Sequence, residues 1–496
     1  MSSTKEKAIT LAKNAAKKVG TALLTTHAKT YGKNSVKKNG ISPDFPLSGF
    51  DCKKTDPNGH FTVGFGKAEM LPEDLHKKRY YMAGYGPYKP INGILDAPFA
   101  HAAYVDDNSG RGAILLISLD CVGTLQKDVD YIRQQLAGFV RMTGCRSIDI
   151  CSTHNHAGID TMGMWGPLPK SGKDKEYMKI VIAAIKKSCE LAYASRRDGD
   201  LYFGQIEVED MQRDPRYPQT YSKLLTRFRF APNDNSREIY LINFAGHAEM
   251  LRSKNKLVSA DWPCVFREYI REYTGAETVL FQGAIGGMIS MLEQDKNPLK
   301  SIQIIGERMG EFALAIQNER KLEPTINTLR RRIYLPCSNL LFIAFGRLRV
   351  FDTDTFSRPD EFYNISLMSE LNYMEIGDVK CLLVPGEIFP ELHTGEYLSA
   401  EESGTGTGAE ANPLPLTEIA QDKDLLVFGL ANAELGYIVP PNDYLLDPIA
   451  PFMVPLPKDR TGRKHYEETN SVGIRCAEVI AETFTEMMQA VKAAKR

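Results

Sequence analysis

The sequence predicts an α/β protein in which β-sheets are covered by helices. Apolar runs of strand length alternate along the chain with segments of helical periodicity. A chain in which many strands are interspersed with helices packs its sheets under helical layers. With 496 residues, of which 43% are hydrophobic, the chain can bury a substantial core.

The strands are predicted from short apolar runs that end in turn residues. The runs at 238–244 and 425–430 are examples, because each is almost entirely apolar and leads into a glycine turn. The predicted strands lie at 61–67, 99–106, 112–119, 146–152, 200–208, 224–231, 238–244, 277–282, 328–336, 379–384 and 425–430.

The helices are predicted from apolar residues that recur every three or four positions. In the last one Val479, Phe484 and Val491 fall on one stripe. The predicted helices lie at 128–140, 173–195, 263–273, 301–318 and 471–495.

The N-terminal segment differs from the rest of the chain. Residues 1–40 contain nine lysines against Glu6 alone, and Ile9, Ala12, Ala16, Val19 and Leu23 follow a helical spacing. We therefore predict a basic extension over 1–50 and one large domain over 51–496. Three interpretations of the extension remain open: contact with an anionic membrane surface, contact with this or a neighbouring subunit in a homo-oligomer, and partial disorder.

The net charge and the cysteine content limit which binding partners and which cellular location are expected. The net charge is −1, from 61 basic and 62 acidic residues, so nucleic acid is not expected as a partner. Nine scattered cysteines without a Cys-x-x-Cys pair indicate an intracellular protein, and the interpretation is a cytoplasmic one. The chain has no run of 18 apolar residues, so no transmembrane segment is predicted.

Two histidines end a predicted strand and suggest a metal site. His154 and His156 follow the apolar run 147–152, and residues two apart on a strand point to the same side. Histidine is the commonest neutral metal ligand, but an isolated pair is equally compatible with a hydrogen-bonded surface strand.

Three further polar residues occupy the same kind of position. His247 follows the strand 238–244, Glu387 follows 379–384 in Pro-Gly-Glu, and Tyr437 follows 425–430. Loops at strand ends carry the site in many layered α/β proteins. Two histidines and a carboxylate suit a catalytic zinc ion, which has three protein ligands and one open position.

These residues carry a resemblance to the neutral or alkaline, non-lysosomal ceramidase family. It runs from about Thr62 to Leu446 and covers that family's catalytic domain only. It includes Gly-Tyr-Gly at 84–86 and Gly-Ile-Leu-Asp-Ala-Pro at 93–98. The most specific piece is Thr-His-Asn-His-Ala-Gly at 153–158, which is similar to the family's Thr-His-Thr-His-Ser-Gly. The resemblance implies a layered α-β-β-α sandwich with two mixed sheets.

The resemblance also implies roles for individual residues. His154, His247, Glu387 and Tyr437 match the four zinc ligands, and His156 matches a group that either supports the ligands from outside the metal or acts in the transition state. Arg213, in Gln-Arg-Asp-Pro, matches an arginine that helps to hold the scissile amide or a product carboxylate. One departure concerns an acid near the metal-bound water, whose place is taken by Gly287. Proton transfer would then fall to His156, to Glu249 or Asp261, or to no residue at all.

Other catalytic classes fit the sequence less well. The metallo-β-lactamase pattern requires a histidine soon after the His-x-His pair, and Asp160 has none behind it. The histidine pair comes too late for a TIM-barrel amidohydrolase, and the chain has neither a serine-hydrolase elbow nor a P-loop.

The function predicted is therefore zinc-assisted hydrolysis of an amide bond in an N-acyl or lipid-like small molecule. Tyr437 or Arg213 would stabilise the oxyanion, and His156 would give a proton to the leaving amine. Met162, Met164, Trp165, Met250 and Met288 could line an apolar pocket, or could equally be core residues. The alternative is a non-catalytic homologue that serves in binding or assembly, which the glycine at 287 keeps open.

Overall fold

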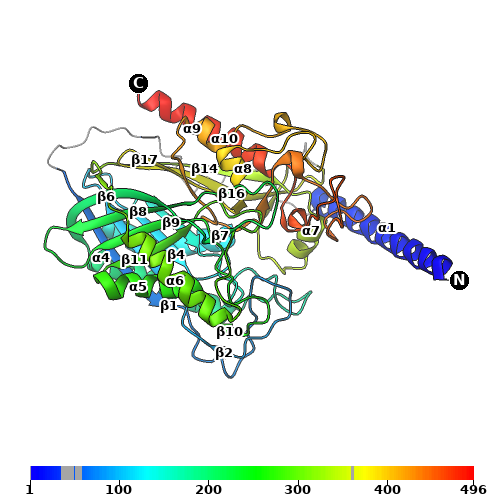
Figure 1. Ribbon diagram of the computed structural model, residues 1–496, viewed down its shortest axis with the longest axis horizontal. Coiled ribbons are helices and arrows are strands. Elements are labelled where there is room, and N and C mark those ends of the chain that lie inside the picture. The colour runs from blue at the N-terminus through cyan, green and yellow to red at the C-terminus, as the bar shows by residue number, and fades with distance from the viewer. Residues whose placement is uncertain (1, 35–49, 51–58, 359–361) are drawn as a thin grey trace.

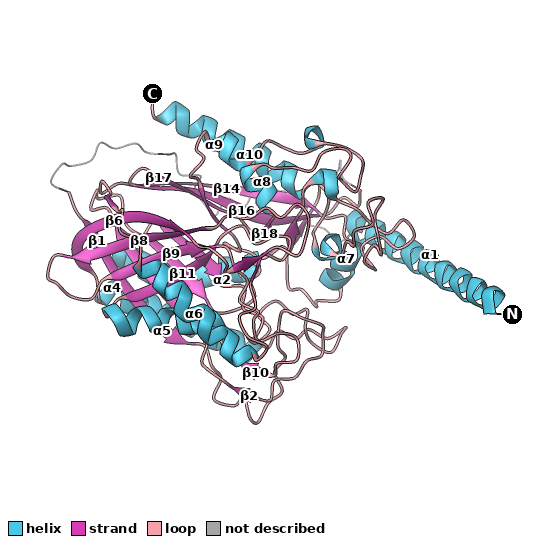
Figure 2. Cartoon of the chain, in the orientation of Figure 1, coloured by secondary structure: helices cyan, strands magenta, loops and turns pink. Residues whose placement is uncertain are grey.

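The chain forms two β-sheets that pack face to face between layers of helices (Figure 1). The computed structural model describes residues 2–34, 50, 59–358 and 362–496. Figure 2 shows the strands of both sheets in the middle of the molecule, with helices outside them. The α-β-β-α sandwich with two mixed sheets is thereby confirmed.

The first sheet contains the longer run of strands, and it is mixed. The pairs β4–β5 and β9–β11 are parallel, and the other neighbours are antiparallel. Every residue of β4, β5 and β9 is buried, as expected for strands covered on both faces. The order is β11 (Glu277–Gln282), β9 (Ile239–Phe244), β8 (Leu224–Pro232), β6 (Arg197–Glu207), β1 (Phe61–Glu69), β3 (Phe99–Asp106), β4 (Ile114–Leu119) and β5 (Ser147–Ser152), with β13 (Arg320–Lys321) beside β6.

The second sheet is smaller and is built around a long hairpin. Strands β16 and β17 are joined by a two-residue turn in which Gly377 has a φ of +60°, a conformation that favours glycine. The order is β14 (Ile326–Pro336), β16 (Ser366–Ile376), β17 (Val379–Leu383) and β19 (Leu426–Phe428), with β15 (Thr355–Phe356) beside β16. Strand β19 is parallel to β17, so the carboxyl ends of both point to the same edge.

The inner faces of the two sheets share one apolar core. Phe61, Phe228 and Phe281 of the first sheet lie in the same buried cluster as Met374 and Phe428 of the second. The outer face of the first sheet is covered by α2 (Gln126–Gln135), α3 (Ala137–Thr143), α4 (Lys175–Ala194), α5 (Trp262–Thr274) and α6 (Pro298–Leu314), and that of the second by α10 (Cys476–Ala494).

The remaining elements are short and lie mostly in the connections. They are β2 (Gly93–Ile94), β7 (Gln212–Arg213), β10 (Leu257–Val258), β12 (Ser290–Met291), β18 (Glu387–Ile388), β20 (Tyr437–Ile438), α7 (Leu340–Arg347), α8 (Pro390–Thr394), α9 (Leu416–Ala420) and the 3-10 turns η1 (Ala409–Ala411), η2 (Pro441–Asp443) and η3 (Glu467–Asn470). The pairs β7–β12 and β18–β20 lie next to the candidate site described below.

The eleven predicted strands are all present, but the sequence did not indicate β16. That strand carries Glu370 and Asn372, which are buried in the structure. Glu370 accepts hydrogen bonds from Arg133, and Asn372 donates to Asp149, so polar residues are tolerated at a central position. Their polarity disguised the strand in the sequence.

The predicted helices also differ in detail. The helix predicted at 128–140 is two helices, α2 and α3, separated at Leu136. The last helix begins at Cys476 and not at Ser471, because Ser471 pairs with Gly436 in a β-bridge. Helix α7 was not predicted.

The basic N-terminal segment contains a long helix, α1 (Ser2–Asn34), as its spacing predicted. Residues 35–49 of the predicted extension lie outside the described residues, so the boundary at residue 50 stays a prediction.

Within the described part of the chain, no helix is long and apolar enough to cross a membrane, and every cysteine is free. The cytoplasmic location stays a prediction.

Candidate metal centre and cavity

His154 and His156 lie on a turn just beyond the end of β5. The strand ends at Ser152, and His154 has a φ of +55°, outside the strand conformation. Their closeness therefore results from a turn and not from the strand alternation that the sequence suggested. The turn is held by backbone hydrogen bonds from Thr153 to the carbonyl of Leu119 and from His156 to that of Ala248, at 2.9 Å each.

His247 comes from the neighbouring end of β9. Its backbone N–H donates to the carbonyl of Ile289, and its own carbonyl accepts from the indole of Trp262, both at 3.0 Å. The side chain is fully buried. Both backbone polar groups of His247 are thus hydrogen-bonded, and they fix the direction of its side chain.

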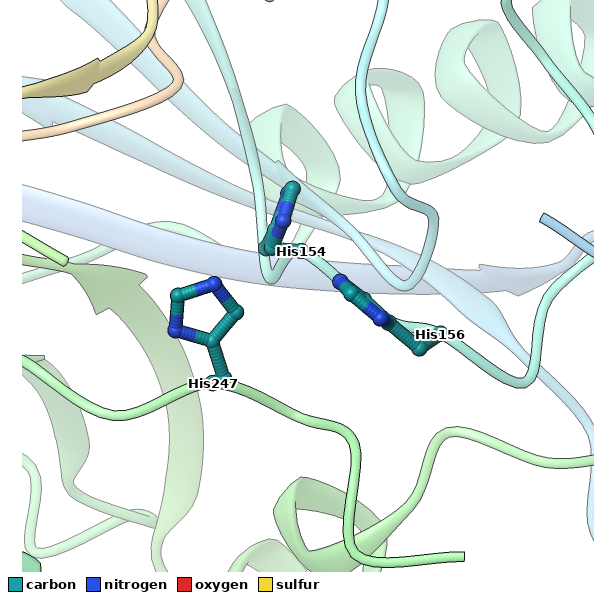
Figure 3. Close-up of side chains that lie close together, drawn as sticks. All are labelled: His154, His156 and His247. Carbon is teal, nitrogen blue, oxygen red and sulfur yellow. The ribbon is translucent and has the colours of Figure 1, made fainter. Parts of the chain in front are cut away.

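The three imidazole rings converge (Figure 3). The centroid of the His154 ring lies 4.7 Å from that of His156 and 4.8 Å from that of His247. One nitrogen of each ring can be chosen such that all three lie within 4.8 Å of one another. The sequence therefore identified three histidines that the fold brings together.

Glu387 completes a cluster with two of the histidines. Its Oε2 atom lies 3.0 Å from Nε2 of His247 and 3.4 Å from Nε2 of His154. Strand β18, which begins at Glu387, enters the site from the second sheet. The cluster therefore joins the two sheets of the sandwich.

The orientation of the two rings leaves acceptor atoms facing one another. Nδ1 of His154 lies 2.8 Å from the carbonyl of Val122, and Nδ1 of His247 lies 2.9 Å from that of Ile289. Because a carbonyl can only accept, each Nδ1 carries a proton, and each ring presents a lone pair at Nε2 when it is neutral. Two such nitrogens beside the Glu387 carboxylate, all buried, need either a proton or a metal cation between them.

A zinc ion suits this arrangement. Ligands at 2.0–2.1 Å from a tetrahedral ion are roughly 3.3 Å apart, close to the two spacings around Glu387. Burial lowers the pKa of His154 to about 3, which keeps that ring neutral as a ligand must be. Burial alone would lower the pKa of His247, but its contact with Glu387 raises it overall. A metal would compete with that proton.

Tyr437 lies beside Glu387 in the same short ladder. The two residues pair in register between the parallel strands β18 and β20. Tyr437 is buried and lines the cavity, and burial together with the charge of Glu387 raises its pKa well above the usual value. Its neutral hydroxyl is placed to donate a hydrogen bond, whereas its coordination of a metal stays a prediction.

His156 is held differently from the other two histidines. Among the described residues, neither ring nitrogen has a hydrogen-bond partner, although the ring is buried. Its Nδ1 lies 3.5 Å from a carboxylate oxygen of Glu249, and the Tyr85 ring packs edge-on at 5.2 Å between centroids. Burial and the neighbouring His247 lower its pKa well below the usual value, so the ring is neutral.

The two acids proposed as alternatives for proton transfer have different positions. Glu249 lines the cavity, and its other oxygen accepts a 2.5 Å hydrogen bond from Ser290. Asp261 caps α5, where it accepts from the backbone of Trp262 and Leu251, and burial raises its pKa to about 6. Of the two, Glu249 is placed to act on a bound molecule.

Gly287 occupies a special backbone position. It has a φ of +79°, and a Cβ atom built there would meet its nearest neighbour, Cδ of Arg216, at 3.5 Å. Space for a small side chain exists, but the conformation favours glycine. The absence of an acid at this position is thus compatible with the local backbone.

Arg213 is not brought into the cluster. It lies on β7, which pairs with β12, and its side chain is exposed and does not line the cavity. Arg216, three residues later, is instead directed inward, 3.0 Å from Glu391 and over the Phe389 ring. The role predicted for Arg213 stays a prediction that its placement does not support.

A cavity of about 500 Å³ opens onto the cluster, and its walls are mainly apolar. Met162, Met164, Trp165 and Met288 line it as the sequence suggested, whereas Met250 belongs to the core under α5 and α6. The remaining lining residues are Gly84, Tyr85, Pro87, Val122, Leu125, Leu168, Glu249, Phe342, Phe345, Phe351, Thr353, Leu367, Glu387, Glu434, Leu435, Gly436, Tyr437, Tyr466, Asn470 and Val472, with His154 and His156.

Several of these residues were not foreseen. Glu434 is a third buried carboxyl group at the cavity, beside Glu249 and Glu387, and burial and the charge of Glu387 raise its pKa well above the usual value. Its position three residues before Tyr437, past the same strand, is a signal that could have identified it. Phe342 and Phe345 come from α7, for which the sequence gave no signal.

The fold and the site define a four-layer α/β protein with a buried histidine and carboxylate cluster at the sheet ends. The structure is similar to the crystal structure of neutral ceramidase from Pseudomonas aeruginosa, with a TM-score of 0.68 and 16% identity over 88% of this chain and 75% of that one. It is also similar to a ceramidase complexed with C2, with a TM-score of 0.67 and 15% identity over 88% of this chain and 76% of that one.

The chain thus has a neutral ceramidase-like fold. No protein-family model matches the sequence, and no curated protein matches it significantly. The likeness therefore lies in the fold, which the sequence motifs had already indicated.

Proposed function

We propose that this chain is a zinc-dependent hydrolase that cleaves the amide bond of an N-acyl or lipid-like small molecule. The observation that carries the proposal is the buried convergence of His154, His247 and Glu387 at the end of an apolar cavity. Convergent acceptor atoms in a dry site have a physical reason to exist if a cation binds there. The fold of the ceramidases supports the reaction class.

In this proposal three side chains hold the metal and one assists. His154 Nε2, His247 Nε2 and a Glu387 oxygen are the ligands, and Tyr437 either ligates or donates a hydrogen bond from beside them. When bound, such an ion supplies Lewis-acid polarisation and acidifies a water molecule. The hydroxyl of Tyr437 is placed to stabilise the negative charge that develops on the carbonyl oxygen.

Proton transfer falls to His156. Its ring is neutral, faces the cavity and has an unused nitrogen, so it can accept a proton from water and return it to the leaving amine. Glu249 lies 3.5 Å from its Nδ1 and stabilises the charged ring. Ser290 donates to one oxygen of the Glu249 carboxylate at 2.5 Å, and the Tyr85 hydroxyl lies 3.0 Å from the backbone carbonyl of Glu249 and 3.4 Å from its other carboxylate oxygen, so both residues hold Glu249 in place.

The acyl part of the substrate is assigned to the apolar wall. Met162, Trp165 and Phe345 line the cavity, whose volume of about 500 Å³ suits a small or medium ligand. An acyl chain placed there removes apolar surface from water and brings its carbonyl to the cluster.

The second candidate is a non-catalytic homologue that binds a molecule without cleaving it. Gly287, which replaces the acid expected near the water, is the observation that favours it. Glu249 and His156 speak against it, because both lie at the cavity and can move a proton.

The metal content of the purified protein tests the proposal. The protein is prepared without added metal and without a nickel column, beside the His247→Ala variant, and is measured by plasma mass spectrometry. About one zinc ion per chain that is lost in the variant supports the site, and hydrolysis of N-acyl amides by the zinc form supports the function. Zinc binding without any hydrolysis favours the second candidate. The absence of bound metal from both proteins contradicts the proposed zinc site.

A further inference from the structure

Helix α1 extends away from the rest of the molecule (Figures 1 and 2). Only its second half is tied down. Thr21 donates to the carbonyl of Ile449 at 2.8 Å, Asn364 donates to that of Gly32 at 3.2 Å, and Ala28 is buried. From Lys7 to Ala16 every residue except Asn14 is exposed, so this half of the helix projects into solvent.

The free side carries a row of positive charges. Lys7, Lys18 and Lys29 are exposed and are eleven residues apart, which is close to three turns, so they lie along one line of the helix. Residues 7–34 contain six lysines and no acidic residue. Lys17 is paired, 3.7 Å from Asp447, on the docked side. Over residues 7–34, therefore, no acidic side chain of the helix accompanies the exposed row.

Apolar side chains lie next to this row. Val19 is 60% exposed and Leu23 67% exposed, and they are four residues apart, on one face. Ala8, Ala12 and Ala15 continue that face toward the N-terminus. Leu11, which is 74% exposed, lies between Lys7 and Lys18 on the same line of the helix. Exposed apolar side chains among lysines can contact both the headgroups and the acyl boundary of an anionic lipid surface.

One helix separates α1 from the cavity. Arg347, at the end of α7, lies 3.1 Å from Nδ1 of His27 on α1, while Phe342 and Phe345 of α7 line the cavity. Leu348, which follows α7, and Leu168, a lining residue, are 56% and 40% exposed. A lipid surface held by α1 would lie near an apolar wall of the cavity.

We propose that α1 docks the protein on an anionic membrane surface, with Lys7, Lys18 and Lys29 on the headgroups and Val19 and Leu23 at the acyl boundary. A second copy of the chain is a poorer occupant, because pairing two such helices would bring like charges together. Nucleic acid would use the lysines but would leave the apolar face unused. The inference does not require catalysis, and membrane binding is measured directly.

Co-sedimentation of the full-length protein with lipid vesicles tests the inference. We expect binding to vesicles of equal parts phosphatidylcholine and phosphatidylglycerol, weak binding to phosphatidylcholine alone, and a loss of binding as salt is raised. The triple variant Lys7→Glu, Lys18→Glu, Lys29→Glu should bind about a hundredfold more weakly. Val19→Ser with Leu23→Ser should also weaken binding, at unchanged charge.

A matched control reverses three exposed lysines elsewhere. Lys187→Glu, Lys296→Glu, Lys300→Glu changes the net charge equally, on α4 and around the start of α6, and should bind as the unchanged protein does. The inference is overturned if the two triple variants behave alike, or if the unchanged protein ignores anionic vesicles. It is also overturned if light scattering shows a dimer that Leu23→Glu dissociates, which would assign the face to a second copy.

Discussion

The Oε2 atom of Glu387 lies 3.0 Å from Nε2 of His247, across 140 residues of sequence. His247 comes from the first sheet and Glu387 from the second, so the contact depends on how the two sheets pack. The other nitrogen of His247 is committed to the carbonyl of Ile289. A ring fixed in this way directs Nε2 at the carboxylate, and either a proton on Nε2 or a bound cation makes that contact favourable.

Removal of individual histidines should separate metal binding from turnover. His247→Ala removes a ligand, so both metal and activity should be lost. His156→Ala leaves the pair at Glu387 intact, so metal should remain while turnover falls by about 10²–10⁴-fold. Metal content and amide hydrolysis are measured on the same samples, with exposed His76→Ala as the control. Normal turnover by His156→Ala would show that its assigned role is wrong.

A glycine next to His156 offers a test that leaves every polar group in place. A Cβ atom at Gly84 would lie 2.4 Å from Cγ of His156, and Gly84 has a φ of +98°. Gly84→Ala should therefore displace the ring and reduce turnover by roughly a hundredfold, with metal retained.

Gly86→Ala is the matched control for Gly84→Ala, because nothing lies within 4 Å of a Cβ atom at position 86. It should retain full activity. Equal activity of both variants would mean that the position of the His156 ring does not matter for turnover.

The sequence predicts a site residue best when that residue directly follows an apolar strand. His154, His247 and Glu387 follow apolar runs, and the ends of such strands meet in a layered fold, so their convergence was predictable. Glu434 was missed, although its position past the same predicted strand as Tyr437 was a usable signal, because its own residue type does not indicate burial. Arg213 was placed by motif likeness, and the ladder between β7 and β12 leaves its side chain exposed.

The strands of the fold likewise divide into those that the sequence could predict and those that it could not. Strands β4 and β9 are apolar throughout because they are covered on both faces, and periodicity identifies such strands. Strand β16 contains Glu370 and Asn372, whose burial depends on arginines from α2 and β14. A strand stabilised by distant charges cannot be recognised from its own residues.

The charge network that conceals β16 should be important for stability. Glu370 is fully buried, with an oxygen 2.6 Å from Arg133 and another 3.1 Å from Arg332. Burial alone would raise the pKa of Glu370, but these arginines lower it to about 2. Glu370→Gln leaves buried arginines without their counter-charge and should lower the free energy of unfolding by about 3–5 kcal/mol.

Denaturant unfolding measures this loss, and an exposed pair supplies the control. Asp378 is paired with Arg320, and the Asp378 side chain is 72% exposed. Asp378→Asn should change the free energy of unfolding by less than about 1 kcal/mol. Equal effects of the two substitutions would contradict a stabilising role for the buried network.

The apolar wall predicts a preference for longer acyl groups. Each methylene that becomes fully buried contributes about 0.8 kcal/mol, so kcat/KM should rise up to about fourfold per methylene until the cavity is filled. Phe345→Ala should reduce this gain for long chains and leave an acetyl substrate unaffected, since Phe345 belongs to the α7 wall. Phe362→Ala, at a side chain that is 69% exposed, is the control. If kcat/KM did not depend on the length of the acyl chain, the apolar wall of the cavity would serve core packing and not substrate binding.

A buried histidine away from the proposed ligands should make stability depend on pH. His465 lies 2.9 Å from Glu468 and 3.2 Å from Asp459. Burial alone would lower the pKa of His465, but these carboxylates raise it to about 8, above the value of about 6.5 in the unfolded chain. The folded state therefore holds the proton more tightly than the unfolded state. This contribution to stability is complete below pH of about 6.5 and is lost as the pH rises through about 8.

His465→Asn isolates that contribution from the other titrating groups. The difference in free energy of unfolding between the unchanged protein and the variant should be largest near pH of about 6 and should shrink toward pH of about 9. Urea unfolding at both ends of this range measures it. A difference that stays constant with pH would mean that His465 stabilises the fold by packing and hydrogen bonding alone. A difference that grows with pH would reverse the sign assigned to its pKa shift, and with it the charge assigned to the ring between Glu468 and Asp459.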